Sequence, residues 1–438
     1  MDMTVIGIIG IIVLIVLLFL GMNVGFSMLA VGFVGFVVAM SQNAALATIK
    51  TVPFNTVANF NLSIIPLFVL MGQFCFHSGV STDLFQTCYK WFNRFSGGLA
   101  VSTIGASMLF SALCGSSPAT VATMGTVCHP EMKRYGYKDA LSTGSIAAGG
   151  TLGILIPPSV GFILYGIATG NSIGALFAAG LFPGIILGFM YMGCVVLMCK
   201  NDPTLAPMND ERFSWIEKFK SLKGVIFVVI LFVVVIGGIF AGIFTANEGA
   251  AIGAFGSFLI LLFRRKLTLK VLLASLHGTV STTAMTFLIL IGAYVFNIFL
   301  AFTQIPQAVA RAASAMDVHN YVILIIFLLV FIVLGLVFDS IAMLLLLVPI
   351  FYPLILDMGM DPIWFGVLMV MCMECGQITP PVGINVFVIK GIAKEVPLQT
   401  IFRGVFPFFL TLLVAIVIMV TFPQISLSLP YFLYPPLA

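Results

Sequence analysis

Two six-residue segments, GILIPP at residues 153–158 and GQITPP at residues 376–381, carry a glycine and a proline pair at the same spacing. Each segment lies inside a long apolar run, and sliding the chain along itself by 223 positions superimposes them. The same shift pairs Ser117 with Ser340. Because a proline pair interrupts a helix, these matches predict two sequence repeats, each with one broken helix.

The composition around these segments excludes a soluble protein. Of the 438 residues, 61% are apolar and 8% are charged, whereas soluble domains average roughly 45–50% apolar and about 25% charged residues. A span takes about 20 apolar residues, and the apolar runs here are continuous rather than alternating. We therefore expect an all-α polytopic membrane protein with about ten spans and additional re-entrant segments. Nucleic acid is not an expected partner, because the basic residues form no stripe.

Basic residues set the expected orientation, since Lys and Arg favour the cytoplasmic side of a membrane. They bracket the apolar runs near 99–113 and 118–130 at both outer ends. These two runs must then enter and leave on one face, which predicts a re-entrant hairpin with its tip at residues 114–118.

The corresponding runs of the second repeat, 321–338 and 341–356, return to a loop that contains Asp357 and Asp361 but no basic residue. This second hairpin is therefore expected to open on the opposite face. Each repeat then has five spans, an odd number, so the two repeats are predicted to have inverted topology, with both chain termini on the periplasmic side.

The proline pairs also expose polar backbone at membrane depth. A proline has no N–H, so the carbonyl four residues earlier loses its helical donor. The predicted free acceptors are the carbonyls of Gly153 and Ile154 in the first repeat and those of Gly376 and Gln377 in the second. Irregular backbone at this depth is tolerated only where it is buried in protein or lines a cavity, so each break predicts an ion or ligand site.

The repeat geometry places one hairpin tip opposite each break, Ser116 and Ser117 at the first and Asp339 and Ser340 at the second. Hydroxyl, carboxylate and carbonyl oxygens are ligands for a hard cation such as Na⁺. The half-helices that follow the breaks direct their N-terminal dipoles at the same region, which favours a carboxylate. A cation and a carboxylate are therefore expected to share one pocket, although Asp339 or Glu374 could carry a proton instead.

Three segments carry a resemblance to a known family: GSSPATVATMGTVCHPEM at 115–132, AAGGTLGILIPPS at 147–159 and ECGQITPPVGIN at 374–385. They resemble the large membrane subunit of TRAP transporters, the tripartite ATP-independent periplasmic family. The resemblance implies an elevator-type transporter that works with a small four-helix membrane subunit and a soluble periplasmic binding protein. It implies a scaffold from residues 1–95 and 224–319, a transport domain from 96–200 and 320–438, and a cytoplasmic linker at 201–223.

The resemblance also implies site residues. The first of two Na⁺ sites would use Ser116, Ser117, Gly153, Ile156 and Pro158, and the second would use Ser340, Gly376 and Thr379. Because Ile156 stands where the second motif has Thr379, its ligand must be a backbone oxygen. The substrate is expected to contact Ser116, Ser117, Pro158, Ser159, Asp339, Pro381 and Asn385.

The expected function is sodium-coupled secondary active uptake of a small carboxylate, of the C4-dicarboxylate or sialic acid type, across the bacterial inner membrane. One alternative is a proton-coupled organic anion transporter that needs no binding protein, and another is a passive channel. An intramembrane enzyme is a remote alternative. The sequence contains no His-Glu-x-x-His motif, and its one Gly-x-Ser-x-Gly match, at residues 170–174, lies between two apolar runs rather than after a strand. No phosphate-binding loop is present to power a nucleotide-driven pump. The sequence leaves open which carboxylate is carried.

Overall fold

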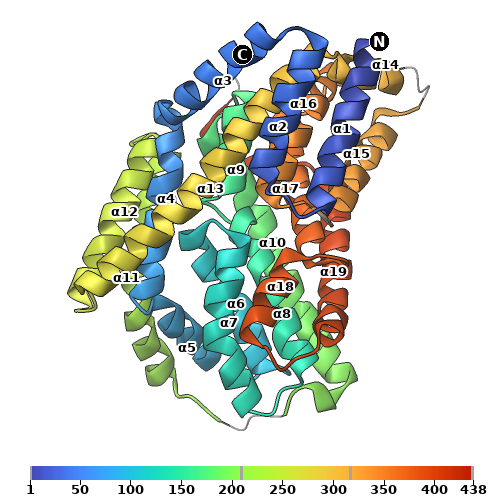
Figure 1. Cartoon of the computed structure of the whole chain (residues 1–438). Helices are drawn as coiled ribbons and strands as arrows, with labels where there is room; N and C mark the ends of the chain where they lie inside the picture. Colours follow the sequence, from blue (N-terminus) through green and yellow to red (C-terminus); the bar gives the residue numbers. More distant parts are fainter. Residues whose placement is uncertain (1, 208–210, 315–317, 337, 436–438) are drawn as a thin grey trace.

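The structure is a computed structural model that describes residues 2–207, 211–314, 318–336 and 338–435. Within these ranges the chain folds into α-helices and two short 3₁₀ turns, without strands. The helices pack side by side into one elongated bundle (Figure 1). The all-α class predicted from the sequence is confirmed.

The first half of the chain ends with the long helix α10. The helices of this half are α1 (Met3–Phe19), α2 (Val24–Ala39), α3 (Gln42–Val57), α4 (Ile64–His77), α5 (Val80–Phe92), α6 (Gly98–Cys114), α7 (Ser117–Arg134), α8 (Asp139–Leu155), α9 (Val160–Thr169) and α10 (Ile173–Asn201).

The second half begins with α11. The helices of the second half are α11 (Trp215–Phe240), α12 (Ala246–Phe263), α13 (Leu269–Phe302), α14 (Ile305–Ser314), α15 (Asn320–Gly335), α16 (Ser340–Asp357), α17 (Pro362–Ile378), α18 (Ile384–Ile392), α19 (Leu398–Thr421) and α20 (Gln424–Leu433).

Eight helical segments of the described chain are long and apolar enough to cross a membrane by length and composition. Several further apolar helices, among them α1, α2, α6, α15 and α17, are shorter than this limit. Lengths of 16 or 17 residues correspond to a rise of about 25 Å, slightly less than a hydrocarbon core of about 30 Å. The protein is therefore a multi-pass membrane protein.

Both predicted helix breaks are present. Helix α8 ends at Leu155 and α9 begins at Val160, while α17 ends at Ile378 and α18 begins at Ile384. The proline pairs lie in the gaps, and each pair is joined by a cis peptide bond.

Two helical hairpins accompany the breaks. Helices α6 and α7 are joined at Gly115 and Ser116, while α15 ends at Gly335 and α16 begins at Ser340. In Figure 1 the first hairpin occupies the lower part of the bundle and the second the upper part. The long helix α13 crosses the molecule diagonally and packs against α2 and α4.

The predicted linker at 201–223 is partly helical, because α11 already begins at Trp215. Ser214 starts this helix with a capping box: the Glu217 N–H donates to Ser214 Oγ at 3.3 Å, and the Ser214 N–H donates to Glu217 Oε2 at 2.8 Å. Such a box satisfies two N–H groups that otherwise lack partners. The apolar-run criterion missed this helix start because its first turns are polar.

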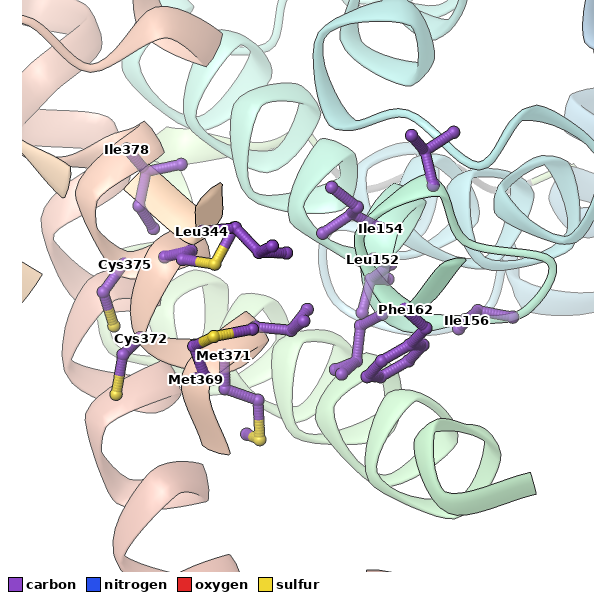
Figure 2. Packing of buried hydrophobic residues seen from close by; sticks show 14 of the residues in the cluster. Leu152, Ile154, Ile156, Phe162, Leu344, Met369, Met371, Cys372, Cys375 and Ile378 are labelled. Atoms are coloured by element: carbon purple, nitrogen blue, oxygen red, sulfur yellow. The ribbon is translucent and has the colours of Figure 1, made fainter. Parts of the chain in front are cut away.

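The apolar core joins elements from both halves of the chain. Figure 2 shows Leu152 and Ile154 near the end of α8 on one side of a buried region and Met369 and Met371 of α17 on the other, with Met371 extending toward Leu152. All four side chains are buried. The two broken helices therefore pack as one unit, which fixes the position of the polar groups at their ends.

Candidate functional site

The first hairpin tip contacts the first break directly. The Val160 N–H donates to Gly115 O at 3.3 Å, so the start of α9 is bonded to the tip. A Cβ added to Gly153 would lie 2.7 Å from both Ser116 O and Thr120 Oγ1. Only glycine therefore allows the end of α8 to approach the tip this closely.

The second tip contacts the second break in a similar way. A Cβ added to Gly376 would lie 2.3 Å from the carbonyl carbon of Gly335, the last residue of α15. Gln377 Nε2 also approaches Phe338 O at 3.5 Å. Each break is thus held against the hairpin of its own half.

The expectation of four free carbonyls is only partly correct. Ile154 O accepts a short hydrogen bond from Ser159 Oγ, and Gly376 O accepts the Thr379 N–H at 3.3 Å. Serine at the start of α9 reaches back to the preceding helix end, and the last turn of α17 tightens to an i→i+3 bond. No described residue donates to the carbonyls of Gly153 and Gln377. A carbonyl has two lone pairs, so Gly376 O can still bind an ion.

Thr379 is oriented as an oxygen ligand would be. Its hydroxyl donates to Cys375 O at 2.6 Å, which uses the hydroxyl proton and leaves the oxygen lone pairs available. The equivalent position in the first break, Ile156, is extended, and its side chain packs toward Gly184. Any ligand there must be a backbone oxygen, as the sequence indicates.

A buried polar cluster links the two halves of the chain. Ser117 Oγ lies 2.9 Å from Gly150 O, 2.6 Å from Glu374 Oε2 and 2.8 Å from Asn385 Nδ2. Ser117, Glu374 and Asn385 are at most 1% exposed. Glu374 Oε1 and Asn385 Oδ1 are buried without any hydrogen-bond partner among the described residues. Unpaired buried oxygens are costly, so this cluster has the donor set of a cation site.

Both tips line one cavity of about 560 Å³, a size typical of small-molecule sites. Helices α4 and α13 form its opposite wall, and helices α7 and α16 begin at it. The lining from the two tips includes Ser116, Ser117, Asp339 and Ser340. Helix N-termini carry partial positive charge, and the first residues of α7, α9, α16 and α18 all line this cavity.

The other residues predicted to contact substrate lie elsewhere. Asn385 lies behind the cavity wall, where it donates to Ser117 Oγ. Pro158 and Ser159 are buried within the first break. Pro381 is exposed in the second break and is absent from the cavity lining.

Four polar residues of the cavity lining were not anticipated from the sequence: Gln73 of α4, Thr123 of α7, and Thr282 and Thr286 of α13. The signal that could have identified them is a polar side chain inside an apolar run. That signal alone is weak, because Thr286 also bonds the carbonyl of Thr282 within its own helix at 3.0 Å.

The described lining of the cavity contains one acidic side chain and no basic one. Asp339 is its only charged residue among the described ones, and its carboxylate accepts the Ile341 N–H at 3.1 Å as the N-cap of α16. An anionic ligand here would have no arginine or lysine partner. Its charge would have to be balanced by helix N-termini or by cations bound nearby.

An ion pair at the lower end of the bundle joins the first hairpin to the second broken helix. Lys133 at the end of α7 lies 2.5 Å from Glu395 Oε1 in the loop after α18. The hydrogen bond from this lysine lowers the pKa of Glu395 to about 2 and raises the pKa of Lys133. Both groups are therefore charged at neutral pH.

Comparisons with known proteins agree with the fold. The family model described as "Tripartite ATP-independent periplasmic transporter, DctM component" matches residues 11–425. A C4-dicarboxylate TRAP transporter large permease protein of Pseudomonas aeruginosa is 35% identical over 87% of this chain and 88% of its own length. A sialic acid TRAP transporter large permease protein of Vibrio cholerae is 34% identical over 94% of this chain and 96% of its own.

A solved structure shares the architecture at low sequence identity. The YdaH transporter of Alcanivorax borkumensis, whose topology is described as unusual, superimposes with a TM-score of 0.62 at 16% identity. The match covers 88% of this chain and 90% of that one. At this identity the likeness concerns the fold alone.

Proposed function

Because the chain belongs to the DctM family of large permeases of tripartite ATP-independent periplasmic transporters, we propose that it performs sodium-coupled uptake of a small carboxylate. Its relatives are transport permeases rather than enzymes, so no chemical conversion is involved. The proposed location is the bacterial inner membrane.

The observation that carries this proposal is the meeting of both hairpin tips at one cavity. The tips supply hydroxyl groups, the adjoining breaks supply carbonyls, and the wall from α4 and α13 closes the other side. Oxygen ligands beside a small cavity suit a hard cation and a small solute that bind together.

Charge balance favours coupling to a cation. The described cavity lining contains Asp339 and no basic side chain, so a carboxylate alone would be repelled. Na⁺ bound by Ser117 and the Gly153 carbonyl at the first break, and by Gly376 and Thr379 at the second, would offset this charge. Substrate binding would then depend on prior or simultaneous ion binding, which is the basis of symport.

The substrate class is proposed from the relatives. One is named for C4-dicarboxylates and another for sialic acid, and both substrates carry carboxylates. The family description is tripartite and periplasmic, so we infer two partners: a four-helix small membrane subunit and a periplasmic protein that delivers the substrate.

Movement of the substrate is proposed to follow an elevator mechanism. The hairpins and broken helices would move as one body against α4 and α13, carrying the cavity across the membrane. The packing between α8 and α17 and the Lys133–Glu395 pair are compatible with such a body.

The test is uptake by the complete three-part system in proteoliposomes. With an imposed inward Na⁺ gradient, radiolabelled substrate should accumulate above its external concentration, and replacing Na⁺ by choline should abolish accumulation. Uptake that persists without Na⁺ and follows a proton gradient would instead support the second candidate, a proton-coupled anion transporter. The buried carboxyl groups of Asp339 and Glu374 are the observation that keeps this candidate open.

A further inference from the structure

Glu374 connects the two breaks through a contact between the two halves of the chain. It lies on α17, two residues before Gly376 of the second break. Its carboxylate reaches Ser117 at the first hairpin tip, with Oε2 2.6 Å from Ser117 Oγ. Asn385, which follows the second break on α18, donates to the same hydroxyl at 2.8 Å. One serine of the first half is therefore held by two residues of the second.

The geometry at Ser117 determines how its hydroxyl can be used. A serine hydroxyl offers one proton and two lone pairs. If the proton is donated to Glu374, Asn385 donates to one lone pair and the other lies on the side of Gly150 O, where a cation would contact both oxygens. If Glu374 no longer accepts, the proton can turn to Gly150 O, which lies 2.9 Å away. Glu374 thus selects one of two orientations of the hydroxyl.

The surroundings of Glu374 add an electrostatic contribution. Within the described part of the chain, no Lys, Arg or His lies at ion-pair distance from it. Asp339 of the second tip and Tyr191 of α10 lie close enough to Glu374 to interact with it electrostatically. The hydroxyl of Ser340 lies close to the same carboxyl, while Glu374 Oε1 is without a hydrogen-bond partner. In its ionised form this carboxyl group would attract a cation to the first tip, which it contacts through Ser117.

We propose that Glu374 is a positioning residue that couples the two ion sites: it orients Ser117 at the first site from the helix that ends in the second. The proposal rests on the sodium-coupled function given above and deepens it. An ion at the first site fixes Ser117 and hence Glu374, and this in turn fixes the end of α17 where Gly376 and Thr379 lie. Each ion should therefore bind more tightly when the other is present, as any coupling between sites must be reciprocal.

The decisive variant is Glu374→Gln, which preserves the size of the side chain and removes its charge. Its effect is measured on the purified complex as the Na⁺ dependence of the thermal unfolding temperature, and in proteoliposomes as the Na⁺ dependence of uptake. The Hill coefficient for Na⁺ should fall from about 2 toward about 1, and half-maximal stabilisation should require at least tenfold more Na⁺. The matched control is Glu248→Gln, a capping residue bonded to Thr245 at the start of α12, which should change neither value.

Substitutions of Ser117, the residue that Glu374 contacts, test the same coupling from the first site. Ser117→Ala should lower the Hill coefficient as Glu374→Gln does, whereas Ser117→Thr, which keeps a hydroxyl, should largely preserve it. In the Ser117→Ala background, adding Glu374→Gln should have little further effect on the Na⁺ cooperativity, because the contact is already lost. A purely structural role for Glu374 would lower the unfolding temperature at every Na⁺ concentration and leave the Hill coefficient unchanged.

The outcomes separate this inference from the proposed function. If the wild-type protein responds to Na⁺ but Glu374→Gln retains the same cooperativity, or if the two substitutions act additively on it, the coupling role is overturned and sodium symport stands. If Glu374→Gln does not fold, unchanged cooperativity in Ser117→Ala overturns the coupling role by itself. If the wild-type protein shows no Na⁺ dependence in either measurement, the proposed function and the coupling role both fall.

Discussion

Single residues at the breaks matter both for the groups they lack, a Cβ or an N–H, and for the hydroxyl oxygens they supply. Gly153 and Gly376 permit backbone contacts that any Cβ would prevent, and the proline pairs remove hydrogen-bond donors. Ser117 and Thr379 then place hydroxyl oxygens beside the exposed backbone. These features account for oxygen-lined sites in a chain that is 61% apolar.

Gly153→Ala is expected to destabilise the protein by about 1–3 kcal/mol, the usual cost of overpacking. The added methyl group would lie 2.7 Å from Ser116 O, so the tip would have to move away from the break. The measurement is the thermal unfolding temperature with and without Na⁺, and both the stability and the Na⁺ response should decrease. Gly193→Ala on α10 is the matched control, because its Cβ meets nothing within 4 Å. An equal effect of the two substitutions would contradict the close contact.

Thr379→Ala is expected to weaken Na⁺ affinity about tenfold, which corresponds to about 1.4 kcal/mol for one lost oxygen ligand. Folding should be affected less than ion binding. Thr421→Ala is a suitable control, because Thr421 Oγ1 also donates to the carbonyl four residues earlier, at 2.8 Å. Na⁺ titrations of thermal stability compare the two variants. Unchanged Na⁺ affinity in Thr379→Ala would remove this residue from the second site.

At the scale of elements, the sequence predicts where helices break better than it predicts which helices line the cavity. Proline pairs and the 223-residue shift locate both broken helices and both tips, because these features depend on nearby chain chemistry. The apolar pattern of the sequence does not predict helix α5, because polar residues interrupt it. The wall residue Gln73 could not be assigned to the cavity, because its proximity to the tips depends on the packing of α4 against other helices.

Gln73→Leu tests whether the α4 wall contacts the substrate. Losing a neutral hydrogen bond of about 0.5–1.5 kcal/mol should raise the KM for the substrate by roughly 2- to 10-fold. Na⁺ affinity without substrate should stay the same, because Gln73 lies on the wall opposite the tips. Gln42→Leu at the exposed start of α3 serves as the control. A change in Na⁺ affinity with constant KM would place Gln73 in an ion site instead.

For the whole molecule, both termini lie at the upper end of the bundle (Figure 1). The loops near Lys138 and Leu205 are bonded to each other at the lower end, with Lys138 N 3.0 Å from Leu205 O. Basic residues gather in this region, which by the positive-inside rule predicts that the lower end is cytoplasmic.

Cysteine accessibility tests this orientation. Lys200 is the second-last residue of α10, shortly before the loop that contains Leu205, and Lys50 lies on α3, the helix at the upper end in Figure 1. Both positions are exposed, and each is replaced by Cys. In intact cells, a membrane-impermeant thiol reagent applied from the periplasm should label Lys50→Cys and leave Lys200→Cys unlabelled. In inverted membrane vesicles the pattern should reverse. The opposite labelling would invert the proposed topology. Labelling of the unsubstituted protein provides the baseline, because six of its eight cysteines are buried and Cys114 and Cys194 are half-buried.

The most direct test of the whole account is the number of Na⁺ ions that the purified protein binds at equilibrium, measured with radiolabelled Na⁺. Sites at both breaks predict about two ions per chain, with one lost in Ser117→Ala and one in Thr379→Ala at moderate Na⁺ concentration. No saturable binding, or two ions that persist in both variants, would contradict the assignment of Na⁺ to the broken helices.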